Sequence, residues 1–134
     1  MQDGTFTLPD YLQVPAPQTG DVFAADCPTR KLLDRVGDKW SVLILTVLGE
    51  GAVRHNGLKR RIGGISQKML SQTLRTLERD GLVSREVRPT VPVAVTYRIT
   101  PLGAELLGAL RLLIDWAETR IPAVAAAQAA YDAG

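Results

Sequence analysis

Apolar positions in the first half of the chain recur at the spacing of α-helices. In "DCPTRKLLDRVG", either Asp26 or Cys27 can cap a helix that has Pro28 in its first turn and ends at Gly37. The next stretch, "DKWSVLILTVL", is apolar on nearly every side, which predicts a helix buried nearly all round. A short extended piece and a short helix follow in "VRHNGLKRRI". These patterns predict three helices before residue 63.

The pattern then changes from helical to strand-like between residues 66 and 99. Ser66 can cap a helix that Asp80-Gly81 ends. Its apolar side holds Met69, Leu70, Thr73, Leu74 and Leu77. Apolar and polar residues alternate on both sides of "PTVP", residues 89–92, where proline cannot donate a hydrogen bond to a sheet. This second part therefore predicts one exposed helix followed by a hairpin.

A long helix is predicted from Pro101 to about Arg120, with Pro122 breaking it and the alanine-rich end adding a further turn or two. One of its apolar stripes contains Leu102, Leu106, Ala109, Leu110, Leu113 and Ala117, and a second contains Leu107 and Ile114. Two stripes are more than one small core needs. We therefore expect the second stripe to pair with a second copy, helped by the first helix, although both stripes could instead be buried within one subunit. The predicted dimer interface is Leu107, Leu110, Ile114 and Trp116.

The order of these elements is that of a winged helix-turn-helix: mainly α with a small β-hairpin, and dimeric through the terminal helices. The chain has 134 residues, which suits a single core. We divide it into a partly ordered N-terminal arm (1–25), a winged helix-turn-helix domain that includes the dimerisation helix (26–121) and an alanine-rich helical tail (122–134).

Basic residues are concentrated in the middle of the chain. Residues 54–88 contain nine Lys or Arg against three Asp or Glu, a net charge of +6, whereas the rest of the chain has seven basic and eleven acidic residues, a net charge of −4. The outer side of the helix predicted after Ser66 carries Lys68, Ser71 or Gln72, Arg75 and Arg79. A solvated charged face does not explain why the acids are segregated. The pattern favours a surface that binds phosphates.

The single Cys27 and the single His55 exclude several chemistries. One chain has too few Cys and His residues for a structural zinc site, and an intrachain disulfide is impossible. No nucleophile elbow or phosphate-binding glycine motif occurs, so we predict no catalysis, metal or cofactor. The sequence also shows no membrane-spanning run and no secretory signal, which predicts a cytoplasmic protein.

Four stretches together resemble the HxlR group of bacterial winged-helix regulators, which are relatives of the MarR group. They are "CPTRKLLDRVGDKWSVLIL", "GISQKMLSQTLRTLERDGLVSREV", "VPVAVTYRITPLGAELL" and "LLIDWAETR", in the family's order and spacing from Cys27 to about Arg120. The resemblance implies a homodimer that binds a pseudo-palindromic operator in double-stranded DNA. The family usually has an aromatic residue at the position of His55 and an arginine in the wing at Val93 or Ala94.

The residues and the resemblance together predict a sequence-specific transcriptional regulator, in our interpretation a repressor. The predicted recognition-helix set is Ser66, Gln67, Lys68, Ser71, Gln72, Arg75 and Arg79. Of these, we expect Ser71, Gln72 and Arg75 to read base edges. The predicted wing and flank contacts are Lys59, Arg60, Arg61, Arg85 and Arg88. The alternative is a winged-helix protein-interaction module that does not bind DNA specifically.

Four single residues keep two interpretations each. Cys27 is either a thiol that senses oxidants or electrophiles, as in some HxlR relatives, or a structural residue at a helix start. His55 is either a ligand-binding or pH-sensitive group or a packed histidine. Trp40 and Trp116 are core or interface residues, or they line a small-molecule effector pocket between the long helix and the DNA-binding lobe.

Overall fold

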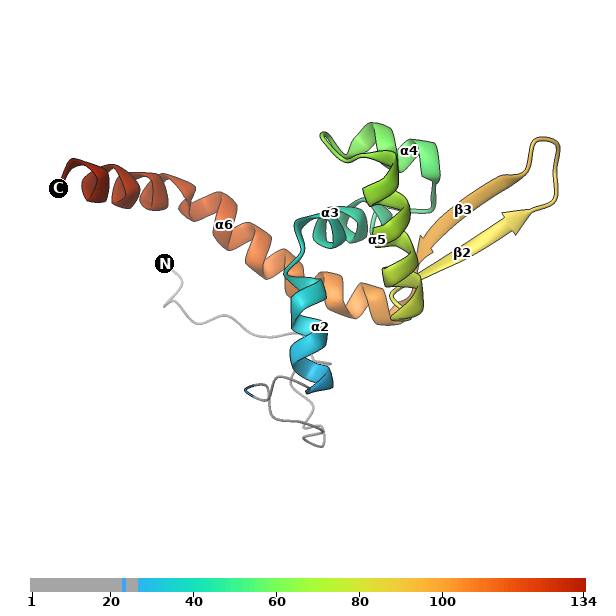
Figure 1. The fold of residues 1–134 in the computed structure, drawn as a ribbon, viewed down its shortest axis with the longest axis horizontal. Helices are drawn as coiled ribbons and strands as arrows, with labels where there is room; N and C mark the ends of the chain where they lie inside the picture. The colour runs from blue at the N-terminus through green and yellow to red at the C-terminus, as the bar shows by residue number, and fades with distance from the viewer. Residues whose placement is uncertain (1–22, 24–26) are drawn as a thin grey trace.

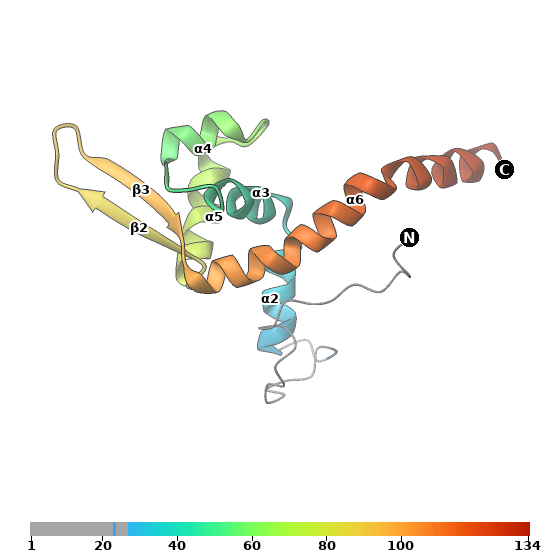
Figure 2. The ribbon, with the colours of Figure 1, turned by 180° about the vertical axis from the view of Figure 1, so that it is seen from behind.

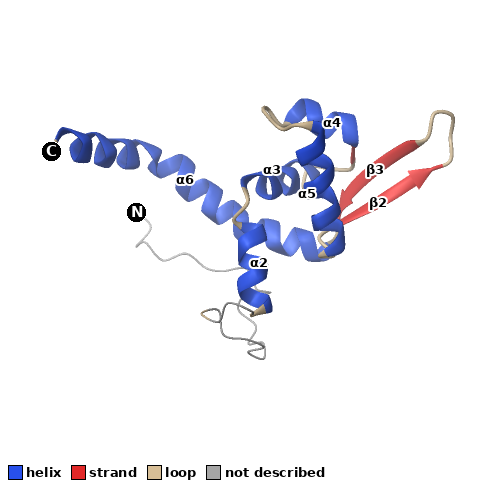
Figure 3. Cartoon of the chain, viewed as in Figure 1, coloured by secondary structure: helices blue, strands red, loops and turns tan. Residues whose placement is uncertain are grey.

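The structure is a computed structural model that describes residue 23 and residues 27–134. Apart from residue 23, the predicted arm lies outside the described residues, and so does the cap assigned to Asp26. The elements are α2 (Pro28–Val36), α3 (Lys39–Leu48), β1 (Val53–Arg54), α4 (His55–Arg61), α5 (Gln67–Arg79), β2 (Val83–Arg88), β3 (Ala94–Ile99) and α6 (Pro101–Ala133). Figures 1 and 3 show these helices gathered around α3, with the β2–β3 hairpin extending to one side and α6 to the other.

The core is centred on α3. Its residues Ile44, Leu45 and Leu48 are almost completely buried among side chains from α4, α5, β2 and α6. Asp38 caps this helix, because its carboxylate accepts hydrogen bonds from the Ser41 amide and hydroxyl. The prediction that this helix is buried nearly all round is wrong on one side, since Leu43 is 42% exposed. A small lobe has too few elements to cover every side of even its central helix.

The helix-turn-helix consists of α4, a short turn and α5, as predicted. Gly64 in the turn has φ +84°, a backbone conformation that side chains with a Cβ rarely adopt. The Ser66 hydroxyl accepts the Met69 amide at 3.0 Å and starts α5. At the other end, Gly81 has φ +77°, and the Leu82 amide donates to the Leu77 carbonyl. Together with the hydrogen bond from the Gly81 amide to the Glu78 carbonyl, this forms a Schellman motif, which turns the chain directly from α5 into β2.

The sheet has three antiparallel strands in the order β1-β3-β2. The hairpin is confirmed: Val83 pairs with Ile99 and Arg88 with Ala94. Pairing of β1 with β3 was not predicted, because a two-residue strand has no alternation to detect. In β2 only Val83 is buried, so the outer part of the hairpin forms a wing that projects from the lobe (Figures 1 and 2).

The helix α6 has 33 residues and does not end before Pro122, contrary to the prediction. The proline removes a hydrogen bond to the Glu118 carbonyl, but both residues are exposed, so water can solvate that carbonyl. Alanine, the best helix former, dominates the following turns and sustains the helix. The last turns run at an angle to the preceding ones, as Figure 2 shows. The helix therefore crosses the predicted boundary between domain and tail, and that division remains a prediction.

Candidate nucleic-acid interface

The outer face of α5 is polar over its whole length. Its inner side buries Leu70, Leu74 and Leu77 in the core. The predicted recognition residues that are exposed on this helix are Gln67, Lys68, Gln72, Arg75 and Arg79. Ser66 lies at the N-cap, with its oxygen engaged by the Met69 amide. The structure therefore brings the predicted set together on one helix, with the basic residues pointing away from the core.

Ser71 differs from its neighbours because its side chain is engaged within the subunit. Its Oγ lies 3.2 Å from Nε2 of His55, the first residue of α4, and both residues are half-buried. The His55 ring also lies against Tyr97 of β3, with ring centroids 6.5 Å apart. His55 is thus a packed histidine that links α4, α5 and the sheet. Ser71 was predicted to read bases, but its hydroxyl already has a hydrogen-bond partner within the subunit and would have to leave His55 to contact a base.

The two predicted wing arginines lie on opposite faces of the hairpin, because residues three apart in a strand point to opposite sides. Arg85 faces α5 and lines a cavity of about 310 Å³ together with Ser71, Arg75, Glu78 and Tyr97. Arg88 lies on the other face, where its Nε is 3.4 Å from a carboxylate oxygen of Glu86.

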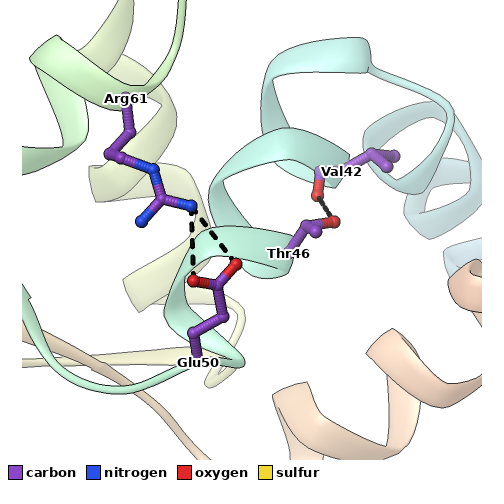
Figure 4. Close-up of polar contacts among 4 residues, drawn as sticks. All are labelled: Val42, Thr46, Glu50 and Arg61. Atoms are coloured by element: carbon purple, nitrogen blue, oxygen red, sulfur yellow. Dashed lines mark hydrogen bonds and ion pairs between the residues drawn. The ribbon is translucent and has the colours of Figure 1, made fainter.

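The last turn of α4 carries the predicted flank residues Lys59, Arg60 and Arg61. Arg61 reaches back to Glu50, just past the end of α3, with Nη2 3.2 Å from a carboxylate oxygen (Figure 4). Figure 4 also shows the hydroxyl of Thr46, which donates to the Val42 carbonyl within α3. Both members of the Arg61–Glu50 pair are more than half exposed, so the ion pair stabilises the fold by at most about 1 kcal/mol.

Two basic residues near the wing were missed by the sequence analysis. Arg98 of β3 and Arg54 of β1 share the outer face of the sheet with Glu86, and Arg98 lies 3.7 Å from that carboxylate. Arg98 directly follows the buried Tyr97 in β3. Because side chains alternate between the two faces of a strand, this neighbour could have placed Arg98 on the outer face. Arg54 gave no such signal, because only the pairing of β1 with β3 positions it.

Most cations in residues 54–88 have no acidic partner among the described residues. Only Arg61 and Arg88 form ion pairs there. The unpaired cations are Arg54, Lys59, Arg60, Lys68, Arg75, Arg79 and Arg85. Like charges on a small lobe repel one another in the isolated protein, and a polyanion would relieve that repulsion.

The predicted dimer residues lie in different environments. Leu107 and Leu110 are buried in the subunit's own core, so the structure contradicts their assignment to a dimer contact. They face inward because this side of α6 packs against α3. Ile114 is half-buried, and Trp116 is 57% exposed. Trp40 packs against the core, with the Lys39 ammonium 4.6 Å from the centre of its ring.

An apolar cavity of about 270 Å³ lies between α2 and α6. It is lined by Leu32, Asp80, Leu82, Leu102, Glu105, Leu106 and Ala109. The structure therefore has a cavity beside the long helix, but neither Trp40 nor Trp116 lines it. At the start of α2, Cys27 is only 4% exposed, and its carbonyl accepts the Lys31 amide.

Over residues 23 and 27–134, no group of three potential metal ligands comes together. None of the helices in this part of the chain is both long and apolar enough to cross a membrane.

A family model described as HxlR-like helix-turn-helix matches residues 35–125. The chain belongs to the HxlR-like helix-turn-helix family. One relative in sequence is the uncharacterized HTH-type transcriptional regulator YtfH of Escherichia coli (strain K12), which is 46% identical over 107 residues, or 80% of this chain and 85% of YtfH. The match to the HxlR-like family includes α3 to β3 and most of α6, and so covers the whole candidate interface.

Solved structures agree with this HxlR-like assignment. The ytfH protein from Salmonella typhimurium, described as a transcriptional regulator, has a TM-score of 0.77 and 43% identity and covers 81% of this chain and 97% of its own. The redox regulator HypR in its reduced form has a TM-score of 0.69 and 33% identity and covers 74% and 98% of the two chains. The fold is a winged helix-turn-helix, and the proteins it is similar to are transcriptional regulators rather than enzymes.

Proposed function

We propose that this protein is a sequence-specific transcriptional repressor that binds a pseudo-palindromic operator as a homodimer. The observation that carries the proposal is the outer face of α5, where Lys68, Arg75 and Arg79 are exposed and have no acidic partner among the described residues. The α5 helix enters the major groove, and its arginine and glutamine side chains meet base edges there.

Each group of cations has its own role in this proposal. Arg75 and Gln72 contact bases, while Gln67, Lys68 and Arg79 hold the phosphate backbone. Arg85 and Arg88 emerge from opposite faces of the wing, so they hold the backbone on both sides of it. Lys59 and its neighbours at the end of α4 contact the flanking phosphates.

The apolar surface that remains on the terminal helices supports the proposed homodimer. Leu33 of α2 and Leu113 and Trp116 of α6 are each more than half exposed. A twofold axis relating two such subunits would set the recognition helices about 34 Å apart, one turn of DNA.

Selection from a random pool of DNA duplexes tests the proposal directly. The expected result is enrichment of a twofold-symmetric site whose half-sites lie one turn apart. If the reduced protein retains no preferred sequence, and its binding only fades as salt rises, the proposal of a specific operator is wrong.

Two matched variants separate base contacts from phosphate contacts. Arg75→Ala should weaken specific binding by about 1–3 kcal/mol and relax the choice of sequence. Lys59→Ala should weaken binding to all duplexes alike and reduce the slope of log K against log salt by about 1. Equal losses on specific and random duplexes for Arg75→Ala would contradict its role at the bases.

The same selection and the salt dependence of binding distinguish the alternative, a winged-helix module that binds only proteins. Binding to an acidic protein would not enrich a DNA sequence. The seven cations in residues 54–88 that have no acidic partner among the described residues favour DNA over this alternative.

A redox signal is a second component of the proposal, supported by the similarity to HypR. The thiol of Cys27 is buried, so reaction with an oxidant or electrophile requires the start of α2 to open. With no second cysteine in the chain, the product would be an intersubunit disulfide, a mixed disulfide or an adduct. If Cys27→Ser retains full oxidant sensitivity of DNA binding, Cys27 has only a structural role.

A further inference from the structure

The cavity of about 310 Å³ between α5 and the hairpin is lined by polar side chains from both elements, which leave their shared turn in different directions (Figure 1). The helix contributes Ser71, Arg75 and Glu78, which are four and three residues apart and so share one side of α5. The sheet contributes Arg85 and Tyr97, which stand directly opposite each other in the pairing of β2 with β3. One helix face and one cross-strand pair thus meet at this cavity.

The charged side chains at this cavity are not used by the fold. Those of Arg75, Arg85 and Glu78 make no ion pair and no hydrogen bond with any other residue in the described part of the chain. Glu78 lines the same cavity as the two guanidinium groups and yet does not neutralise either of them by direct contact. Two positive charges and one negative charge are therefore left for water or for a ligand.

Tyr97 adds a buried hydroxyl to these charges. The residue is only 8% exposed, and its ring lies beside that of His55. A buried tyrosine hydroxyl normally has a hydrogen-bond partner, but this one has none over residues 23 and 27–134. The neighbouring Ser71 hydroxyl is already engaged by His55. A ligand that accepts a hydrogen bond from the Tyr97 phenol would therefore satisfy a group that the fold leaves unsatisfied.

The signs of these charges select the class of ligand. A simple anion such as phosphate would suit the two arginines but would bring a second negative charge close to Glu78. A simple cation would suit Glu78 but would be repelled by both arginines. A molecule that carries a carboxylate and an ammonium group matches all three charges. The volume lies at the lower end of the range for small-molecule sites, which suits a ligand of amino-acid size.

We propose that this cavity binds a free amino acid. The guanidinium groups of Arg75 and Arg85 donate hydrogen bonds to its carboxylate, as arginines do in paired contacts with carboxylates. The Tyr97 phenol donates to the same carboxylate, and the ammonium group of the ligand donates to Glu78. The ligand thereby connects the recognition helix to the sheet, which otherwise contribute charges that no contact neutralises.

An amino acid in this cavity releases the operator, an effect that rests on the proposed function. Its carboxylate takes up the guanidinium of Arg75, which would otherwise contact bases, and that of Arg85, which would otherwise hold the phosphate backbone. The two ligands therefore compete for the same donors. By thermodynamic linkage, operator DNA must lower the affinity for the amino acid by the same factor as the amino acid lowers the affinity for the operator.

Binding to the full chain without DNA tests the site itself. Each standard amino acid is added at about 10 mM in a thermal-shift assay, where a ligand that binds the folded state raises the unfolding temperature. The amino acid with the largest shift is then titrated by calorimetry beside its deaminated and decarboxylated analogues. Both analogues should bind at least about tenfold more weakly, because each lacks one charged contact. A shift with no amino acid, or a deaminated analogue that binds as tightly, would overturn the proposal.

A substitution at Glu78 gives a readout that general damage to the fold would not produce. Glu78→Gln should weaken binding of the amino acid by about tenfold or more and raise the affinity for its deaminated analogue, so the order of the two ligands reverses. Glu118→Gln is the matched control, because Glu118 is an exposed carboxylate on α6 that does not line this cavity. An unchanged order of ligands for Glu78→Gln, or the same loss for Glu118→Gln, would contradict the assigned contact.

Tyr97→Phe separates a ligand contact from a structural role. It should weaken binding of the amino acid several-fold while the urea midpoint stays the same or rises, since the phenol has no partner among the described residues. A lower urea midpoint with unchanged ligand affinity would show that the phenol serves the fold, and would remove it from the site.

The inference and the proposed function fail separately in these experiments. Amino acid binding by a protein that enriches no operator would leave the site intact and contradict the DNA-binding function. Specific DNA binding by a protein that no amino acid stabilises would contradict only the site. If Tyr97→Phe then weakened operator binding, a DNA phosphate would be the occupant instead. An operator that stays bound in fluorescence anisotropy at saturating amino acid would contradict the release.

Discussion

The contact between His55 and Ser71 joins the two helices of the helix-turn-helix and yields a quantitative prediction. The Nε2···Oγ distance is 3.2 Å, and both residues are half-buried. A neutral hydrogen bond of this kind contributes about 1 kcal/mol net to stability, within roughly 0.5–1.5 kcal/mol. Ser71→Ala should therefore lower the unfolding temperature by about 4–8 °C, the shift that 1 kcal/mol produces in a domain of roughly 100 residues.

A double-mutant cycle isolates this hydrogen bond from other effects. His55→Phe removes only the polar partner of Ser71 and keeps an aromatic ring beside Tyr97. An aromatic residue is what the HxlR family usually has at position 55. Urea unfolding of Ser71→Ala, His55→Phe and the double variant should give a coupling energy of about 0.5–1.5 kcal/mol. In parallel, Ser71→Ala should lose less than tenfold in affinity for the selected operator, because its hydroxyl is already engaged.

The opposite pattern would refute this reasoning. If the two substitutions add within about 0.3 kcal/mol in stability, the contact contributes nothing measurable. If Ser71→Ala at the same time loses more than tenfold in operator affinity, Ser71 is a base contact and leaves His55 when DNA binds.

Two further predictions concern the packing of α6 and the charge on the wing. A Cβ on Gly103 would overlap the Leu82 carbonyl oxygen and lie 2.8 Å from Ile99, so Gly103→Ala should destabilise the fold by about 1–3 kcal/mol in urea unfolding despite the higher helix propensity of alanine. Gly63→Ala is the control, because its Cβ meets nothing within 4 Å, and a larger loss there would contradict the overlap argument. Glu86→Gln should raise DNA affinity a few-fold in fluorescence anisotropy, since it removes the carboxylate that pairs with the wing arginines; an unchanged affinity at low salt would place this face of the wing away from DNA.

Local patterns in the sequence determined most of the elements. Pro28, Ser66 and Asp80-Gly81 mark helix ends because caps and turns depend on a few adjacent residues. The hairpin followed from alternation, since side chains in a strand point to opposite faces in turn. The basic outer face of α5 was predictable for the same reason, because helical periodicity separates its cations from its buried leucines.

Contacts between distant residues were decided only by the tertiary structure. Both sides of α6 are apolar in sequence, and only its packing against α3 selects Leu107 and Leu110 for the core and leaves Leu113 and Trp116 exposed. The helix α6 continues past Pro122 because that segment is exposed, so water can solvate the carbonyl that the proline leaves unpaired. The strand β1 and the hydrogen bond from His55 to α5 join segments far apart in the chain. Periodicity can show which side of a segment is apolar, but which neighbour covers that side depends on how all the elements pack together.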